Sequence, residues 1–268
     1  MRIICVALMG ALIGTGAAWA QAANACGSLP NFMALKNALT MATSQETSGL
    51  NNHMWGTIVD RDGVVCAVAF SGTNRGAQWL GSRVISAQKA NTGNLFSLDN
   101  SSSSAGSGQA GGLALSTANL YSAVQPGGSL FGLQASNPVN TAAAYGGAAL
   151  RYGTAMDPMV GQKIGGINVF GGGVPLYDAQ HNLVGGLGVS GDTSCADHSI
   201  AWRTRNILML DHMAAAGSLA AVKGISGDAA RPDNIVFDIG ANGQSAGGFG
   251  HPKCINTGDQ TKLPAVRP

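Results

Sequence analysis

Apolar residues recur every three or four positions in several stretches of the chain, as expected for amphipathic helices with one buried face. The pattern predicts helices over residues 30–45, 78–92 and 113–124, and a further helix that starts at residues 191–194. Gly93 is expected to end the second helix, because glycine readily adopts the left-handed conformation found just after a helix C-terminus.

Two pairs of strand-like segments predict two β-hairpins. Residues 54–59 and 64–70 flank the tight-turn sequence 60–63, which offers a glycine for positive φ. Residues 171–177 and 183–190 flank a second polar turn. Two hairpins with flanking helices, and no regular alternation of strand and helix, predict an α+β fold: an antiparallel sheet flanked by helices.

The remaining segments are less patterned. Residues 97–112 include a low-complexity run of serine and glycine that predicts a surface loop, at the start of a longer insertion over about 97–160. A short late strand is predicted over residues 234–239, and an irregular extension follows from about residue 240. We expect residues 21–268 to form a single domain, because the candidate chemistry draws on both sides of the low-complexity loop.

The N-terminus predicts export. Residues 1–20 combine a charged Arg2, an apolar run and a final Ala-x-Ala signal, the three parts of a cleavable signal peptide. We therefore expect the mature chain to begin at Gln21 and to be periplasmic or secreted. The apolar run is shorter than the roughly 20 residues of a membrane span, so stable membrane insertion after cleavage is not expected.

Composition narrows the class of partner. Apolar residues make up 45% of the chain, enough for a sizeable core, whereas charged residues make up only 10% against about 25% in average soluble proteins. The formal net charge is +2 and basic residues form no stripe, which argues against a nucleic-acid partner.

Four cysteines remain after signal cleavage: Cys26, Cys66, Cys195 and Cys254. An even number in an oxidising compartment favours two disulfides. We predict the pairs Cys26–Cys66 and Cys195–Cys254, because the members of each pair lie in the same third of the chain. A zinc site is the alternative, since Cys195 and His198, with His251 and Cys254, have the spacing of metal ligands.

The order of the two hairpin blocks resembles the haem-binding GlcG/HbpS family, which includes the C-terminal domain of PduO-type proteins. The resemblance covers roughly residues 30–92 and 164–212, and its most specific part is the segment Gly171–Asp192. It implies an antiparallel sheet flanked by helices, assembly into a homo-oligomer, and haem or a similar tetrapyrrole as ligand and cofactor. Residues 30–45, which supply an iron ligand in some members of the family, contain no histidine, so no iron ligand is assigned.

The function that this resemblance implies is that of an exported binding protein for haem or a similar tetrapyrrole. A haem-degrading or redox enzyme of the same family is one alternative, and a structural or interaction module without ligand is another. Catalytic motifs do not favour an enzyme: Glu46 is the single glutamate, and the glycine-rich segments lack the strand-to-helix setting of a nucleotide-binding loop.

We expect the ligand site in the segment between Gly185 and His198. Glycines in a strand suggest that a flat ligand or another backbone comes close, and the start of the following helix could hold a carboxylate with unpaired N–H groups. The alternative is that the glycines only seat a helix on the sheet. The predicted site residues are Gly185, Gly186, Gly188, Ser190, Gly191, Asp192, Thr193 and His198.

Overall fold

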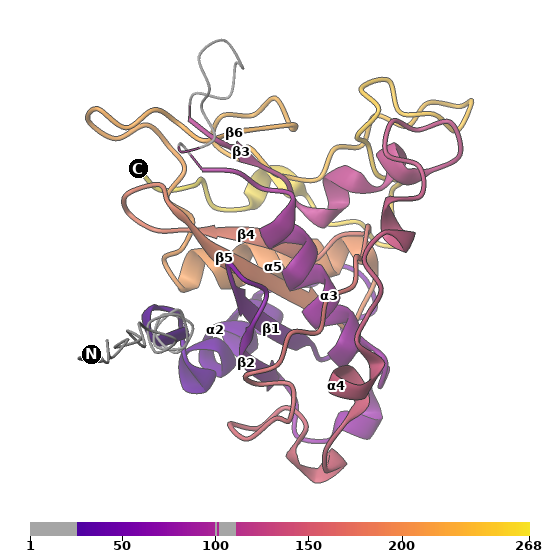
Figure 1. Cartoon of the computed structure of the whole chain (residues 1–268). Helices are drawn as coiled ribbons and strands as arrows, with labels where there is room; N and C mark the ends of the chain where they lie inside the picture. The colour runs from indigo at the N-terminus through magenta and orange to yellow at the C-terminus, as the bar shows by residue number, and fades with distance from the viewer. Residues whose placement is uncertain (1–25, 100, 102–110) are drawn as a thin grey trace, which may run out of the picture.

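A four-stranded antiparallel sheet forms the centre of the protein (Figure 1), and it confirms the predicted α+β class. The computed structural model describes residues 26–99, 101 and 111–268. The predicted signal peptide (residues 1–20) and most of the low-complexity run (residues 100 and 102–110) lie outside the described residues.

Both predicted hairpins are confirmed. The first pairs β1 (Trp55–Asp60) with β2 (Val65–Phe70), and the second pairs β4 (Gly173–Tyr177) with β5 (Leu183–Ser190). β1 also pairs with β5, which gives the strand order β2-β1-β5-β4. The two hairpin blocks, far apart in the sequence, therefore form one continuous sheet.

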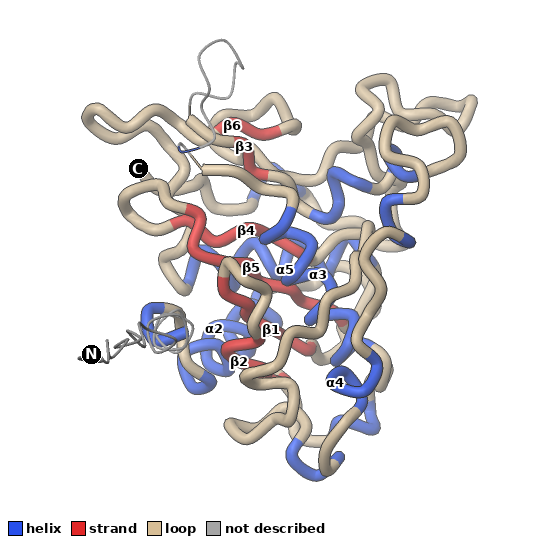
Figure 2. Tube along the Cα trace, in the orientation of Figure 1, coloured by secondary structure: helices blue, strands red, loops and turns tan. Residues whose placement is uncertain are grey.

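Helices and short strands complete the fold (Figure 2). The α-helices of the described residues are α2 (Phe32–Gln45), α3 (Ser82–Leu95), α4 (Thr141–Tyr145) and α5 (Ser194–Ile207). The minor strands are β3 (Leu113–Ala114) and β6 (Lys223–Gly224), which pair in parallel. Short 3-10 turns occur at Cys26–Ser28, Arg75–Ala77, Thr117–Leu120, Ser122–Val124, Leu133–Ala135, Ala149–Arg151 and Gln260–Lys262.

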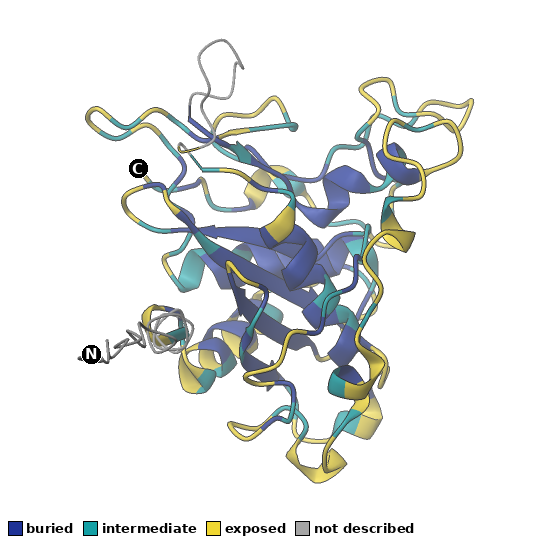
Figure 3. Ribbon diagram, viewed as in Figure 1, coloured by how far each residue is buried: buried dark blue, intermediate teal, exposed yellow. Residues whose placement is uncertain are grey.

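The sheet is covered on both faces. Leu35 and Leu39 of α2 and Ile200 of α5 pack with Leu187 and other apolar side chains of one face. Residues of α3 pack with the alternate strand residues of the other face. Because both faces are covered, the strands are almost entirely buried (Figure 3).

Both predicted disulfides are present. Cys26–Cys66 ties the turn before α2 to β2, and Cys195–Cys254 ties the C-terminal extension to the first turn of α5. His251 lies close to the second disulfide. Because the sulfurs of Cys195 and Cys254 are bonded to each other, they are not free to act as the zinc ligands of the alternative hypothesis.

The C-terminal extension belongs to the core. Leu263 and Val266 are buried in a cluster with Tyr177 of β4 and Trp202 of α5. The carbonyl of Arg267 accepts hydrogen bonds from two backbone N–H groups of residues 213 and 214, at 2.9 and 2.8 Å. The last residues of the chain therefore cover an apolar surface of α5 and β4.

Three predicted elements are wrong in their bounds or type. The second helix begins at Ser82 rather than 78 and continues through Gly93, because this glycine is needed for close packing: a Cβ there would lie 3.0 Å from the carbonyl carbon of Val174. Residues 113–124 form a two-residue strand and 3-10 turns instead of a helix, and residues 234–239 are irregular. In both segments side chains bond to the backbone and compete with regular structure, as Ser116 and Asn119 do in a capping box.

Candidate functional site

The glycines of β5 seat α3 on the sheet. A Cβ on Gly188 would lie 1.9 Å from the backbone oxygen of Ser86, and one on Gly186 would lie 2.1 Å from that of Ala90. The backbone of α3 therefore fills the space that the missing side chains leave. The structure assigns these two glycines to helix packing, the alternative considered for them, rather than to an open ligand surface.

The neighbouring predicted site residues are also enclosed. A Cβ on Gly185 would lie 2.1 Å from the carbonyl oxygen of Val59, and one on Gly191 would lie 2.4 Å from that of His53. Ser190 is buried and pairs with Trp55 across the sheet. These residues fix the contact between β5 and β1. All residues from 185 to 192 are buried.

Asp192 anchors a loop instead of capping a helix. Its carboxylate accepts hydrogen bonds from the backbone N–H groups of Leu50 and Asn52, at 2.8 and 2.9 Å. The side chain of Asn52 returns a hydrogen bond to the carbonyl of Gly191, at 3.0 Å. The segment that precedes β1 is therefore held against the end of β5 by three hydrogen bonds.

The start of α5 is occupied by the protein's own chain. Thr193 is the N-cap, and its side chain accepts from the N–H of Ala196. The N–H of Cys195 donates to the Sγ of Cys254 at 3.1 Å, and Ser194 bonds His251 at 2.7 Å. The expectation that this helix start offers free N–H groups to a carboxylate is corrected, because the C-terminal extension covers it.

His198 is fully buried. Its Nε2 lies 3.1 Å from Oδ1 of Asn234 and 3.2 Å from the N–H of Ile235. Burial lowers the pKa of His198 to about 4, so the ring is neutral at neutral pH. An imidazole enclosed in this way cannot reach an external ligand without local opening of the structure.

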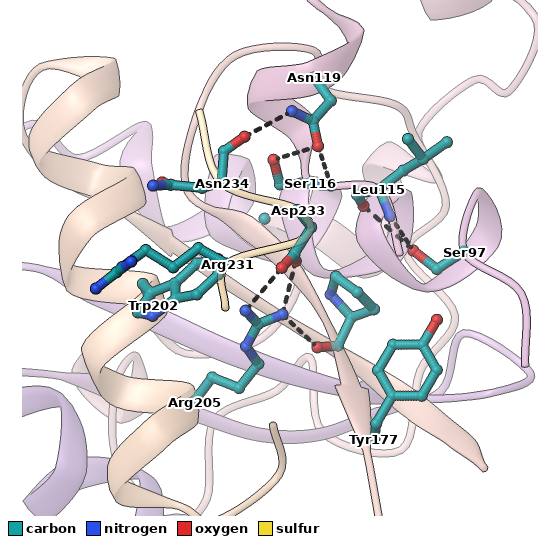
Figure 4. A network of polar contacts seen from close by, with 12 residues as sticks. Ser97, Leu115, Ser116, Asn119, Tyr177, Trp202, Arg205, Arg231, Asp233 and Asn234 are labelled. Carbon is teal, nitrogen blue, oxygen red and sulfur yellow. Dashed lines mark hydrogen bonds and ion pairs between the residues drawn. The ribbon is translucent and has the colours of Figure 1, made fainter. Parts of the chain in front are cut away.

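The segment around Asn234 is itself pinned by a buried polar network (Figure 4). Arg205 donates to both carboxylate oxygens of Asp233, at 2.7 and 2.9 Å, and to the carbonyl of Pro175, at 3.1 Å. The side chain of Asn119 donates to the carbonyl of Asn234 at 2.9 Å. The network joins α5 and β4 to the segment at residues 233–234, and this segment covers His198.

The five histidines of the chain differ sharply in exposure. His181, His198 and His251 are buried, with exposed fractions of 1%, 0% and 2%. His212 is half-buried, and its Nδ1 lies 2.6 Å from the carbonyl oxygen of Pro268. His53 is the one histidine of the five that is exposed as a residue.

His53 lies at a surface cavity of about 280 Å³ between α2 and the loop before β1. Thr40, Thr43 and Ser44 of α2 form one wall. The remaining lining residues come from the loop and the end of β2: Asn51, Asn52, His53 and Ser71. The cavity therefore combines one titratable side chain with hydroxyl and amide groups.

The amino-acid sequence contains little that indicates this cavity. His53 stands in a short polar run before a strand, which is also typical of a solvated loop. Two tertiary contacts distinguish it: the anchoring of its loop by Asp192, and the hydrogen bond between its Nδ1 and Ser71, at 3.2 Å. Asp192 and Ser71 lie 139 and 18 residues away from His53 in the sequence.

No helix among the residues that the structure describes is long and apolar enough to cross a membrane. A search of curated proteins finds no match to the chain.

Comparison with solved structures finds similar chains, among them the following three. A Klebsiella pneumoniae protein, ORFY, is 21% identical, with a TM-score of 0.41, over 67% of this chain and 90% of its own. A PduOC:haem complex is 22% identical, with a TM-score of 0.40, over 65% of this chain and 89% of its own. HbpS is 14% identical, with a TM-score of 0.38, over 76% of this chain and 99% of its own.

A family model matches more than half of the chain. It is described as "Haem degrading protein HbpS-like", and the match runs over residues 33–205. This range contains α2, both hairpins, α3 and nearly all of α5, which are the elements that build the central sheet and its two helical layers. The protein therefore belongs to the HbpS-like family.

Proposed function

We propose that the protein is an exported binding protein for haem or a similar tetrapyrrole. Membership of the HbpS-like family, whose description names haem, is the observation that carries the proposal. The signal-like N-terminus and the two disulfides support export.

The cavity at His53 is where the described chain offers a group that haem iron could take as a ligand. Haem iron takes histidine, methionine, cysteine or tyrosine as a ligand, and His53 offers an exposed imidazole there.

The size of the cavity limits how the ligand would sit. Its volume of about 280 Å³ is just below the ~300–1,000 Å³ of pockets that enclose a small molecule. A porphyrin would therefore place one edge in the cavity and leave much of its plane on the surface. A second copy of the chain could cover the rest, in keeping with the homo-oligomer that the family resemblance implies.

The chain's own residues would bind and orient the group. Asn51, Asn52 and Thr43 offer polar groups for a carboxylate, and Asp192 holds their loop in place. When bound, haem would supply an iron centre for ligand binding and electron transfer.

A hemin titration of the purified protein tests the proposal. We expect a saturable shift of the Soret band with a fixed stoichiometry per chain. Metal-free protoporphyrin IX, followed by quenching of its fluorescence, serves as a second probe that needs no iron ligand. Absence of saturable binding of either probe would favour a structural or interaction module and would refute the proposed function.

Haem degradation is the second candidate, because the family description names it. The same complex separates the two functions. A degrading enzyme loses the Soret band when a reductant and oxygen are added in the presence of catalase, and it releases iron and a ring-opened product. A binding protein keeps the band under these conditions.

Export has its own test. Expression of the full chain in a bacterial host, followed by N-terminal sequencing of the periplasmic protein, is expected to give Gln21 as the first residue. An intact Met1 would contradict export.

A further inference from the structure

We propose that the chain, before the disulfide at α5 has formed, binds one zinc ion through Cys195, His251 and Cys254, and that oxidation of the two cysteines releases the ion. The inference is independent of the proposed function, since it uses no residue of the cavity at His53 and no haem chemistry. Every chain is synthesised with free thiols, so a reduced form precedes the disulfide.

Three donor atoms converge at the start of α5. One ring nitrogen of His251 and the sulfurs of Cys195 and Cys254 all lie within 4.8 Å of one another. Two thiolates and one imidazole are a donor set of zinc, which lies about 2.0–2.3 Å from each ligand atom. When the S–S bond is absent, each sulfur can turn about its Cα–Cβ bond, so one ion can take the place of that bond. The fourth position of the ion is then left to water.

The imidazole of His251 is held in the manner of a metal ligand. Its Nδ1 lies 2.6 Å from the carbonyl oxygen of Pro252, so Nδ1 carries the proton and Nε2 the lone pair. Metal-binding histidines commonly donate their other ring N–H to a backbone carbonyl in this way. The ring also packs against that of Tyr121, with centroids 4.9 Å apart. The hydroxyl of Ser194, 2.7 Å from Nε2, is the partner that an ion would replace.

The surroundings of the two sulfurs favour thiolates, the form of cysteine that binds metals. Cys195 lies in the first turn of α5, where the helix dipole stabilises negative charge. Its backbone N–H donates to the Sγ of Cys254 at 3.1 Å. The hydroxyl of Thr257 lies 4.0 Å from the Sγ of Cys195. Each sulfur therefore has a nearby polar group that can stabilise its negative charge.

The segment that carries two of the three ligands is fixed by bonds other than the disulfide. The N–H of His251 donates to the carbonyl of Val236 at 2.7 Å. The N–H of Cys254 donates to the hydroxyl of Thr257, and that hydroxyl donates to the carbonyl of Cys254, both at 2.8 Å. These bonds can keep the ligands in place while the cysteines are reduced, as a preformed site requires.

Two other groupings of possible ligands are less suited to zinc. His198 is held by Asn234, whose Oδ1 lies 3.1 Å from its Nε2. The disulfide Cys26–Cys66 has Asp60 beside it, and a carboxylate oxygen is a harder ligand than an imidazole. Both groupings therefore provide controls.

Formation of the disulfide releases the ion by thiol–disulfide exchange. The oxidant is a small-molecule or protein disulfide, written RSSR. One cysteine thiolate attacks RSSR and expels RS⁻, and the second thiolate attacks the resulting mixed disulfide and expels a second RS⁻. Two electrons pass from the cysteine sulfurs to the oxidant. The zinc ion loses both thiolates and leaves as the aqueous ion.

The test uses the purified protein after reduction with a phosphine and removal of metal. Co²⁺ is the spectroscopic probe, and Zn²⁺ is the competitor that displaces it. Four proteins are compared: wild type, His251→Gln, His198→Asn and the Cys26→Ala/Cys66→Ala double variant. Circular dichroism shows whether each reduced protein is folded, and the oxidised wild type serves as a further control.

We expect the reduced wild type to bind one Co²⁺ per chain with the charge-transfer absorption of thiolate ligands, and the oxidised protein to bind none. Zinc should raise the melting temperature of the reduced protein, because the ion binds the folded state. His251→Gln should bind less tightly by roughly 100-fold or more, since even loss of a group that orients a ligand costs about 10- to 100-fold. The other two variants should bind as the wild type does. Oxidised glutathione should release one zinc ion per chain, counted with a chromogenic chelator.

Three results would overturn the inference: no thiolate-to-cobalt absorption in the reduced wild type, unchanged affinity in His251→Gln, or loss of binding in the Cys26→Ala/Cys66→Ala variant. If reduction unfolds the protein, zinc should restore the folded circular dichroism of the wild type but not that of His251→Gln, and failure to do so would also overturn it. Hemin binding has no bearing on these results, so the proposed function is tested separately.

Discussion

The Nζ of Lys89 lies 2.6 Å from the Oδ2 of Asp197, and both side chains are almost completely buried, with exposed fractions of 0% and 1%. The pair joins α3, on one face of the sheet, to α5, on the other. Asp197 also accepts the N–H groups of Gly191 and Asp192, at 3.0 and 2.8 Å. One carboxylate therefore holds both helical layers and the turn at the end of β5.

Removal of Lys89 should be strongly destabilising. Lys89→Met leaves a buried carboxylate without its cation, and we expect a loss of about 3–5 kcal/mol in the free energy of unfolding, measured with urea. Arg203→Ala is the control, because its ion pair with Glu46 is partly exposed and longer, at 3.6 Å. That variant should lose less than ~1 kcal/mol. Equal losses of unfolding free energy in the two variants would show that the buried Lys89–Asp197 pair contributes no more to stability than the partly exposed pair.

The titration of His198 should lower stability as the solution becomes acidic, whereas that of Asp197, whose pKa burial raises to about 6, acts in the opposite direction. The pKa of His198 is lowered to about 4, first by burial, while the nearby charge of Asp233 opposes the shift. The unfolded chain therefore binds a proton near pH 6.5 that the folded chain does not take up until about pH 4. The contribution of His198 to stability is fully present above pH 6.5 and declines between these two values. Burial lowers the pKa of His251 as well, in the same direction.

Urea midpoints measured from pH 7.5 to 4 check this dependence. A His198→Asn variant keeps a polar side chain and removes the titration, so its stability relative to the wild type should rise as the pH falls over the same range. An unchanged slope would mean that His198 is not responsible.

Gly188 should not tolerate a side chain. A Cβ there would lie 1.9 Å from a backbone oxygen of α3, so Gly188→Ala must displace the helix, at a cost of about 3 kcal/mol, the upper end of the usual range for overpacking. Gly81→Ala is the matched control at the start of the same helix, since nothing lies within 4 Å of its Cβ and φ is −63°. We expect that variant to be neutral or more stable by about 0.4–1 kcal/mol. Thermal melts decide between the two outcomes.

Loss of the second disulfide should loosen the extension. Cys195 and Cys254 are 59 residues apart, and closing a loop of that size stabilises by about 4 kcal/mol in the chain-entropy model. The Cys195→Ala/Cys254→Ala double variant should lose a similar amount and show faster amide exchange around residues 250–260. The Cys26→Ala/Cys66→Ala double variant provides the comparison. In that variant we expect the amides of the extension to remain protected from exchange. Equal exchange in both double variants would contradict a local role.

Asp192 should matter more than a helix cap does. A cap contributes about 1 kcal/mol, whereas Asp192→Ala leaves the N–H groups of Leu50 and Asn52 without their acceptor, at about 1–3 kcal/mol each if they stay buried. Because the same loop carries His53, hemin affinity should fall as well. Thr193→Ala, which removes the actual cap, should lower stability alone. Calorimetry and hemin titration on both variants test this difference.

The sequence was sufficient to predict the hairpins of the sheet, since strands and turns are encoded by neighbouring residues. It was also sufficient to predict the disulfide pairs. It was not sufficient for α3, where Arg83, Lys89 and Asn94 are buried. Such polar residues interrupt the apolar pattern of a helix, and only their distant partners, such as Asp157 and Asp197, explain their burial. The bounds of that helix were wrong for this reason.

The candidate site also depends on distant contacts that the sequence alone does not reveal. Glycines in a strand fit both a ligand and a helix, and the choice depends on which backbone lies above them. His53 and Ser71 come together only through the register of β1 and β2, in which Trp55 pairs with Phe70. Residue type and local spacing alone contain no information on that distance.

The packing of the C-terminal extension has a consequence for the timing of biosynthesis. Leu263 and Val266 complete the cluster around Trp202, and Arg267 bonds the segment that follows α5. The ribosome makes these residues after those of the sheet and of α5, so the apolar side of α5 stays uncovered until the extension has been synthesised. Folding around α5 is therefore completed only once the whole extension is available to dock.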